Sequence, residues 1–118
     1  MAIVVAQDGL ASSTDNIDTT PADLLATSGS QGLPVPKAAR WILTAKNTGS
    51  VDATVKLYKR AGSNAAFVLV ASYTVVATTG TLTVECDAEA AEAVRFTAET
   101  ASSTTTMAAD FRAVGQTI

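Results

Sequence analysis

Hydrophobic and polar residues alternate along most of the chain from Ala38 onward. In the segment 51–58, every second residue is apolar, and the residues between are polar or charged. The apolar set is Val51, Ala53, Val55 and Leu57. A period of two places one set on each face of an extended strand, so this pattern predicts a half-buried β-strand.

The preceding segment, 40–46, alternates in the same way, with Trp41, Leu43 and Ala45 on one side. The four residues 47–50, Asn-Thr-Gly-Ser, separate it from the strand at 51–58 and are all common in turns. We therefore expect these two strands to form an antiparallel hairpin.

A second hairpin is predicted further along the chain. The segment 66–76 is rich in β-branched residues and leaves both faces partly apolar, Thr78-Thr79-Gly80 supplies a turn, and 81–86 alternates again. Two more alternating segments follow, at 94–99 and 105–113. Short strands with a turn signal about every ten residues indicate an antiparallel β-sandwich or jelly roll.

Residues 1–36 have weaker periodicity and many Ser, Thr, Asp and Gly residues. We expect them to form an extended N-terminal arm with one or two short strands, attached to a sandwich body at 37–118. Each proline in 33–36 disfavours helix at the residue before it, so that stretch is predicted to be extended. The alternative for residues 21–26 is a short helix with Thr20 as its cap and Pro21 in its first turn.

The segment 87–93, Asp-Ala-Glu-Ala-Ala-Glu-Ala, is a local helix former with Asp87 placed to cap it. We expect a loop or a single helical turn that crosses between the sheets.

Composition points towards association. Of the 118 residues, 47% are hydrophobic and only 5% aromatic, while Ala and Thr together make up about a third of the chain, well above average usage. A core of Ala and Val gains less transfer free energy per residue than one of Leu and Phe. We therefore expect the chain to gain stability by associating with itself or with other proteins.

The charge balance disfavours nucleic acid as a partner. The formal net charge is −3 and the pI is about 4.7, whereas phosphate binding requires clustered Lys and Arg. No apolar run has the length of a membrane span, and no N-terminal targeting pattern is visible. Neither a membrane nor a nucleic-acid partner is predicted.

Residues suited to catalysis or metal binding are few. The chain has no His, which is the most common general base, so no enzyme activity, metal or cofactor is predicted. The single cysteine, Cys86, shares an apolar phase with Leu82 and Val84 and is interpreted as a buried structural thiol. Carboxylates gather around 85–92 and at 15–18, but neither group has the spacing of a Ca²⁺ loop, and solvated acids are the preferred interpretation. The first group consists of Glu85, Asp87, Glu89 and Glu92.

Two aromatic residues are candidates for partner contact. Trp41 has the phase of Leu43 and Ala45, which favours the core or a subunit interface over an exposed sugar-stacking platform. Tyr58 lies on the polar face of its strand and is the better candidate for an exposed contact.

The stretch 35–57, VPKAARWILTAKNTGSVDATVKL, resembles small virion proteins of tailed bacteriophages, in particular capsid decoration (cement) proteins with a β-sandwich or jelly-roll body. Its proline-containing entry and apolar strand lead through an Asn-Thr-Gly turn into a strand of the type Asp-Ala-Thr-Val-x-Leu-Tyr. The similarity covers about a fifth of the chain and transfers no functional residue.

The resemblance implies a homotrimer on the capsid surface, made in the host cytoplasm, that bridges subunits of the major capsid protein. An arm that orders on docking gains main-chain hydrogen bonds by β-augmentation. We expect capsid contact from the arm, at Ile3, Val4, Val5 and Leu33, and subunit contact from Trp41 and Tyr58. Other virion components, such as a head-fibre base or a tail-tip protein, remain open. A carbohydrate-binding or receptor-binding module of a fibre or tail is the alternative from another class, and it requires Trp41 or Tyr58 exposed in a groove.

Overall fold

The computed structural model describes residues 4–25, 33–34, 38–62, 64–87 and 93–117, and all regular structure within them is β-strand. The strands are β1 (Val4–Ile17), β2 (Ala22–Asp23), β3 (Leu33–Pro34), β4 (Ala38–Asn47), β5 (Ala53–Arg60), β6 (Val68–Val75), β7 (Thr81–Asp87), β8 (Ala93–Glu99) and β9 (Thr105–Thr117). The predicted all-β class is confirmed. No helix capable of spanning a lipid bilayer occurs in the described part of the chain.

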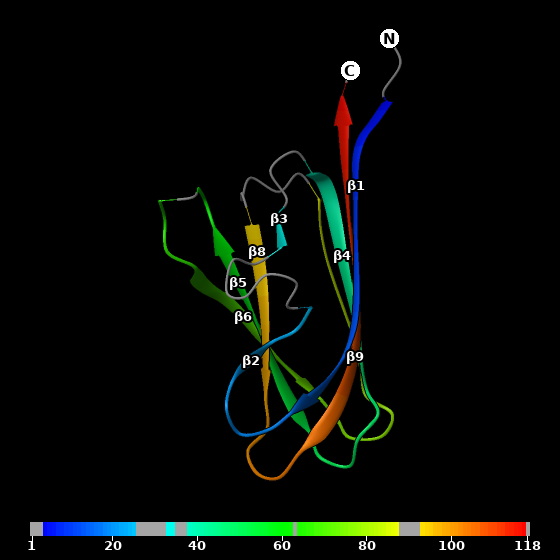
Figure 1. Ribbon diagram of the computed structural model, residues 1–118, viewed down its shortest axis with the longest axis vertical. Coiled ribbons are helices and arrows are strands. Elements are labelled where there is room, and N and C mark those ends of the chain that lie inside the picture. Colours follow the sequence, from blue (N-terminus) through cyan, green and yellow to red (C-terminus); the bar gives the residue numbers. More distant parts are fainter. Residues whose placement is uncertain (1–3, 26–32, 35–37, 63, 88–92, 118) are drawn as a thin grey trace.

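The strands form two antiparallel sheets that face each other (Figure 1). The first sheet has the order β1-β9-β4-β7, and the second has the order β2-β8-β5-β6, with β3 also paired to β8. The pairs β1·β9, β2·β8, β4·β7 and β5·β6 alternate between the two sheets, so the chain runs as one long antiparallel ribbon folded back and forth across the sandwich. This strand order is that of a jelly roll, which agrees with the predicted sandwich or jelly roll.

The core lies between the sheets and is filled by the inward set of each alternating strand. At its centre, Trp41 of β4 meets Phe96 of β8 edge-on, with ring centroids 5.7 Å apart, and lies 6.0 Å from Phe111 of β9. Phe96 and Phe111 are 6.3 Å apart. Such aromatic pairs contribute about 0.5–1.5 kcal/mol each beyond the area that they bury. The three rings therefore join the two sheets, because Phe96 belongs to the second sheet and the other two to the first.

Both predicted hairpins are wrong. β4 and β5 lie in different sheets, and so do β6 and β7, so the turns at 47–52 and 76–80 cross from one sheet to the other. The strand that pairs with β5 as its hairpin partner is β6. The alternation of hydrophobic residues was sufficient to place the strands, but a short turn-rich link serves equally for a hairpin or for a crossing between sheets.

Asn47 explains why the chain crosses at this point. Its side chain is fully buried; Oδ1 accepts hydrogen bonds from Gly49 N (3.0 Å) and Thr105 Oγ1 (2.6 Å), and Nδ2 donates to the carbonyl oxygens of Val51 (2.8 Å) and Val75 (3.0 Å). These bonds close the 47–51 loop on itself and direct β5 away from the plane of β4. A Cβ on Gly49 would come within 2.0 Å of Thr105 Oγ1, so only glycine fits there.

The two crossings are also bonded to each other. Asn47 N donates to Gly80 O (2.9 Å), and Thr78 N donates to Gly49 O (2.8 Å). Thr48 N donates to Thr106 O (2.9 Å) at the start of β9. We name the loops 47–52 and 76–80 together the corner. Its backbone hydrogen bonds run within each loop, between the two loops and to the start of β9, and not along a hairpin ladder.

The N-terminal part differs from the expected arm. β1 pairs with β9 from Val4 opposite Thr117 to Ile17 opposite Thr105, so residues 4–17 form an edge strand of the sandwich body (Figure 1). Ile17 is fully buried in the core. This strand was not predicted because residues 12–16 are all polar and show no alternation with apolar residues. In the structure, one set of these side chains faces solvent and the other is only half-buried.

The alternative helix at 21–26 is not formed either. Ala22 and Asp23 pair with β8, and Leu24 N donates to Phe96 O (2.8 Å). Leu24 and Leu25 are 2% and 3% exposed, so this segment closes one side of the core as a short strand and turn. Of the stretch 33–36 expected to be extended, residues 33–34 are confirmed as a strand paired with β8, and 35–36 lie outside the described residues. Of the segment 87–93 expected to be a loop or helical turn, Asp87 ends β7 and Ala93 begins β8, and 88–92 lie outside the described residues.

Candidate interaction surface

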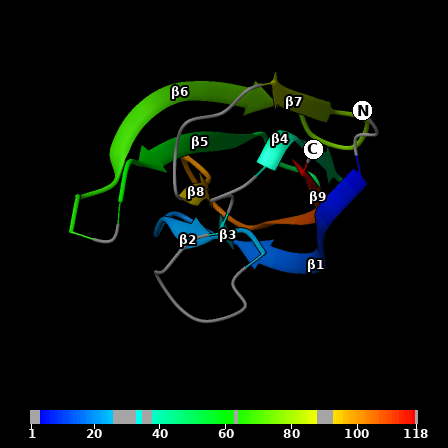
Figure 2. The ribbon, with the colours of Figure 1, turned by 90° about the horizontal axis from the view of Figure 1, so that it is seen from above.

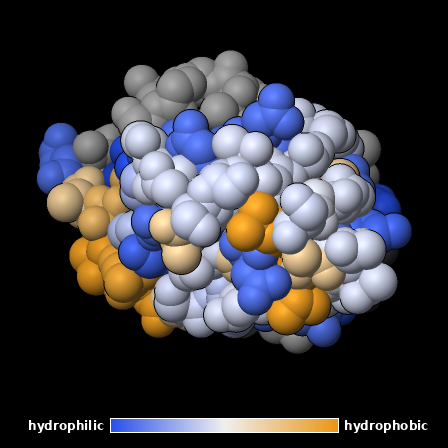
Figure 3. All heavy atoms as spheres, turned by 90° about the horizontal axis from the view of Figure 1, so that it is seen from below, coloured by the Kyte–Doolittle hydropathy of each residue, from blue (hydrophilic) through white to orange (hydrophobic). Residues whose placement is uncertain are grey.

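In the described part of the chain four large apolar side chains are at least half exposed, and three of them form a continuous run at the beginning of β6. Val68, Leu69 and Val70 are 63%, 50% and 52% exposed, and we name these three residues the β6 edge patch. Figure 3 shows hydrophobic atoms gathered along one margin of the molecule, on the side where Figure 2 places the β5–β6 hairpin. A contiguous apolar patch on a protein surface commonly marks an interaction site.

The patch lies on a strand edge. β6 pairs with β5 on one side only and is the last strand of its sheet. Backbone groups on its other side therefore face away from the sheet, which makes an edge strand a template for a further strand.

A β-bulge in β6 determines the face of the sheet on which Leu69 lies. Leu57 is opposite Ala71 and Tyr58 is opposite Leu69, so Val70 is an extra residue on β6. Directly opposed residues share a face, and Tyr58 is on the outer face of the sheet because Leu57 beside it is buried. The bulge thus places Leu69 on the outer face beside Tyr58, although strict alternation from Val75 would have turned it inward.

Next to the patch, the outer face of the second sheet is charged and ion-paired. Arg95 Nε lies 2.6 Å from Asp23 Oδ1, and Lys56 Nζ lies 2.8 Å from Glu99 Oε1. The hydrogen bond and the charge of Glu99 raise the pKa of Lys56 above its ordinary value of 10.5. At the hairpin end of β5, the Arg60 guanidinium lies 4.7 Å from the centroid of the Phe67 ring, within the range of a cation–π contact. The apolar run is therefore bordered by charges held in contacts within the same chain.

Of the two predicted subunit-contact residues, only Tyr58 has a side chain at the surface, and its contact with a second subunit stays a prediction. Tyr58 is half-buried on the outer face, between Leu69 of β6 and Arg95 of β8. Trp41 is 1% exposed and packs in the core, so it has no surface to offer a second subunit. This placement corrects the interface assignment of Trp41 and removes it as a sugar-stacking platform. The core interpretation of its phase is the one that agrees with the structure.

The residues predicted for capsid contact do not form one cluster in the described part of the chain. Ile3 lies outside the described residues. The backbones of Val4 and Val5 pair with Thr117 and Gln116 of β9, and Leu33 pairs with Val94 of β8 in the other sheet. Their backbones are thus already engaged in the sandwich.

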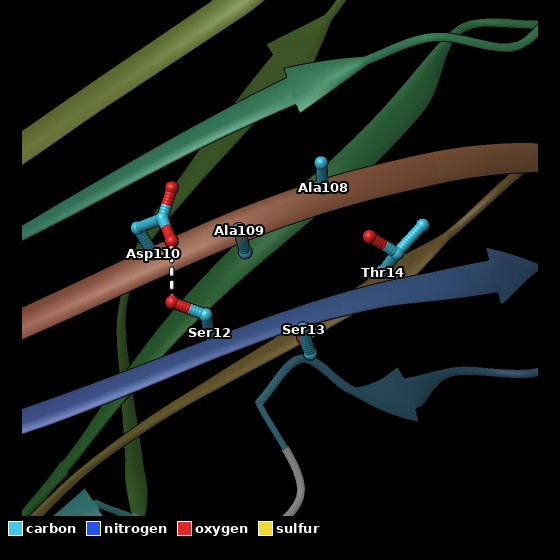
Figure 4. A pocket seen from close by; sticks show the side chains of 6 residues that line it. All are labelled: Ser12, Ser13, Thr14, Ala108, Ala109 and Asp110. Atoms are coloured by element: carbon cyan, nitrogen blue, oxygen red, sulfur yellow. Dashed lines mark hydrogen bonds between the residues drawn. The ribbon is translucent and has the colours of Figure 1, made fainter.

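An open groove of about 380 Å³ runs over β1 and β9 on the first sheet (Figure 4). Its lining consists of small residues, and its one charged group, the Asp110 carboxylate, accepts a hydrogen bond from Ser12 Oγ at 2.5 Å. The lining residues are Ser12, Ser13, Thr14, Ala108, Ala109 and Asp110. No aromatic side chain lines this groove, so it lacks the platform that the carbohydrate-binding alternative requires.

The acidic groups considered for Ca²⁺ are used locally where the structure describes them. Asp15 Oδ2 accepts from Ser13 Oγ (2.7 Å), and Asp18 Oδ1 accepts from Thr20 N (2.8 Å). Glu85 is exposed on β7, while Glu89, Glu92 and the side chains of Cys86 and Asp87 lie outside the described residues. Within the described part of the chain, no three His, Cys, Asp or Glu residues are grouped for a metal ion.

The sequence interpretation missed the β6 edge patch as a site. The signal was the run Phe67-Val68-Leu69-Val70, in which both faces of a strand are apolar. Such a run is typical of a strand buried on both sides, and only the sheet order shows that this one is at an edge.

Comparison with known proteins gives the fold and no closer relationship. No family model and no curated protein matches the chain. A crystal structure of PirA superposes with a TM-score of 0.57, at 16% identity, over 86% of this chain and 92% of PirA. A chain from the disulfide-linked pili of Bacillus endospore appendages matches with a TM-score of 0.53, at 15% identity, over 94% of this chain and 87% of its own length.

The Yersinia pseudotuberculosis-derived mitogen matches with a TM-score of 0.53, at 16% identity, over 89% of this chain and 86% of the mitogen. None of these three is a phage capsid protein. Identities this low establish a shared β-sandwich fold, and a shared fold does not by itself carry a function.

Proposed function

We propose that this chain is a non-enzymatic structural protein of a virion, a decoration protein that binds the surface of a phage capsid and bridges subunits of the major capsid protein. The support for the phage assignment is the resemblance of residues 35–57 to such proteins. The homotrimer is the oligomeric state that this resemblance implies.

The observation that carries a role in protein assembly is the β6 edge patch. Three successive large apolar side chains, each at least half exposed, stand on a strand edge. These three side chains are not part of the core of the monomer, which β6 contacts through residues 71, 73 and 75.

The size of the patch suits a repeated contact. Three exposed side chains amount to a few hundred Å², whereas a stable pairwise interface buries about 800 Å² on each partner. A single contact of this size is weak. Between copies held side by side on one shell the same contact is far more effective, because each further contact is effectively intramolecular.

Binding to capsid shells tests the proposal. Shells are assembled from the major capsid protein encoded in the same genome, without this chain, and mixed with the purified protein. We expect saturable co-sedimentation in a gradient, and a native mass by light scattering near three times 12.0 kDa for the free protein. Failure to co-sediment at tens of micromolar protein would overturn the capsid assignment. Binding to a glycan array in place of shells would favour the receptor-binding alternative.

A further inference from the structure

The β6 edge differs from the other strand edges wherever the structure describes their side chains. At the edge of the first sheet, β7 exposes Thr81, Thr83 and Glu85, and at its opposite edge β1 exposes Ser12, Thr14 and Asn16. In the second sheet, the edge opposite β6 is the two-residue strand β2. Polar side chains, charges, short length and β-bulges are the devices that prevent edge-to-edge pairing. Where the structure describes side chains, the first three residues of β6 lack the first three of these devices, and the bulge at Val70 is the one that they carry.

The composition of β6 indicates which strand fits beside it. The segment Val-Leu-Val-Ala-Ser-Tyr-Thr-Val has no charged residue, so two copies laid side by side bring no like charges together. The described edges of β1 and β7 would instead set Val and Leu against Ser, Thr, Asn and Glu. Among the edge residues whose side chains the structure describes, the best match for β6 is β6 of a second copy.

We propose that β6 of two copies lie side by side and antiparallel across a two-fold axis near Leu69. The apolar run is then self-complementary: Leu69 of one copy faces Leu69 of the other, and in each copy Val68 and the bulged Val70 lie on either side of the axis. A two-fold contact of this kind uses the same surface on both subunits and closes on itself. It joins chains in pairs, and with a three-fold contact elsewhere on the chain it links trimers.

Nearby charges do not oppose this arrangement. The closest cations, Lys59 and Arg60, are on β5, which is one strand further from the axis than β6. The two β5 strands are three strand spacings apart, about 14 Å, which exceeds the screening length of about 8 Å at physiological ionic strength. The guanidinium of Arg60 is also held over Phe67 of its own chain.

The inference rests on the proposed function only in that the chain acts by assembling with protein. A pair of copies would present two capsid-binding surfaces, which is what bridging neighbouring capsid subunits requires. Failure of the pairing and failure of capsid binding are separate results, because the first is measured on the purified chain alone.

Cysteine cross-linking tests the pairing. In a Cys86→Ser background, which removes the one natural thiol, Leu69→Cys places a thiol at the proposed axis. Thr74→Cys places one on the same exposed strand five residues away, so the two copies of this control thiol lie about 34 Å apart in an antiparallel pair. We expect mild oxidation to convert most of the Leu69→Cys protein into a species of twice 12.0 kDa on a non-reducing gel, and little of the control.

Other cross-linking patterns would overturn the proposal. Equal cross-linking at both positions indicates strands running parallel around an axis, and cross-linking at neither position indicates that β6 does not pair. A second pair of variants keeps the natural cysteine. Leu69→Arg should abolish any concentration-dependent doubling of the native mass, whereas Thr74→Arg should preserve it. A native mass that stays at the unpaired value at every concentration, or doubling that persists in Leu69→Arg, contradicts the pairing, whatever the result of the capsid assay.

Discussion

β6 and β7 are consecutive strands, and each lies at the edge of its own sheet. They differ in the side chains that they expose there. β7 alternates strictly, with Val84 buried and Thr83 and Glu85 exposed on either side of it. β6 alternates only in its second half, and its first three residues are all exposed and apolar. The two strands meet at the corner, where Val75 and Gly80 are both buried.

This difference separates a part of the sandwich whose apolar side chains are covered within the chain from a part where they are left exposed. At the corner, side chains and backbone groups are satisfied within the chain. Towards the hairpin end of β6, the apolar side chains have no cover in the same chain, which is the situation of a surface that associates. The polar edge of β7 meets the usual requirement for a strand edge that stays in solvent.

The largest expected effect is at the corner. Asn47→Ala removes both hydrogen bonds donated to the carbonyls of Val51 and Val75 and the acceptor for Thr105 Oγ1. Leaving buried polar groups without partners should lower the free energy of unfolding by about 3 kcal/mol, measured by urea denaturation. Asn16→Ala is the control, because Asn16 is exposed and accepts one bond of 3.3 Å. Equal losses in the two variants would contradict the role assigned to Asn47.

The end of β6 offers an adjacent pair of valines in opposite environments. Val75 is 1% exposed and Val76 is 51% exposed. Val75→Ala should cost about 2 kcal/mol of unfolding free energy, from lost burial and the cavity that remains, whereas Val76→Ala should change it by less than about 0.5 kcal/mol. Thermal or urea unfolding of the isolated chain distinguishes them. Similar losses of unfolding free energy in the two variants would contradict the assignment of Val75 to the core and of Val76 to the surface.

A Val→Thr substitution, which keeps the shape of the side chain and adds a hydroxyl, compares the edge strands β7 and β6 directly. Val84→Thr on β7 buries a hydroxyl and should cost about 1.5 kcal/mol. Val70→Thr on β6 exposes the hydroxyl to water and should leave the unfolding free energy of the dilute chain nearly unchanged. If Val70→Thr destabilises the dilute chain as much as Val84→Thr does, the β6 edge patch belongs to the core and not to the surface.

The smallest effect is expected at the charges beside β6. Glu99 raises the pKa of Lys56, so this ion pair stabilises the fold at neutral pH, and the contribution is lost as the pH rises through the raised value, above 10.5. Lys56→Gln should therefore lower the urea midpoint slightly at pH 7, and the difference from the native chain should shrink as the pH rises through the raised pKa of Lys56. Lys46→Gln, at an exposed lysine on β4, is the comparison. A difference that persists unchanged at high pH would exclude the ion pair as its cause.

Much of the fold was predictable from local pattern. Alternation in the segments 40–46, 51–58, 81–86, 94–99 and 105–113 located five strands, and the phase of Trp41 with Leu43 and Ala45 correctly indicated its place in the core. The candidate site was harder to predict from the sequence. The apolar run at 67–70 was visible, and Tyr58 was correctly placed on the outer face, but no local feature marks a strand as an edge.

The sequence by itself determined the β class, the positions of most strands and the inward set of each, because a period of two and the burial of apolar side chains are local properties. Only the tertiary structure decided that both turn-rich links cross between sheets, that residues 4–17 join the body, and that β6 is an edge. Those outcomes depend on contacts between residues far apart in the chain, such as Asn47 with Val75 and Thr105, or β1 with β9. The pattern of neighbouring residues along one strand does not specify which distant strand will pair with it.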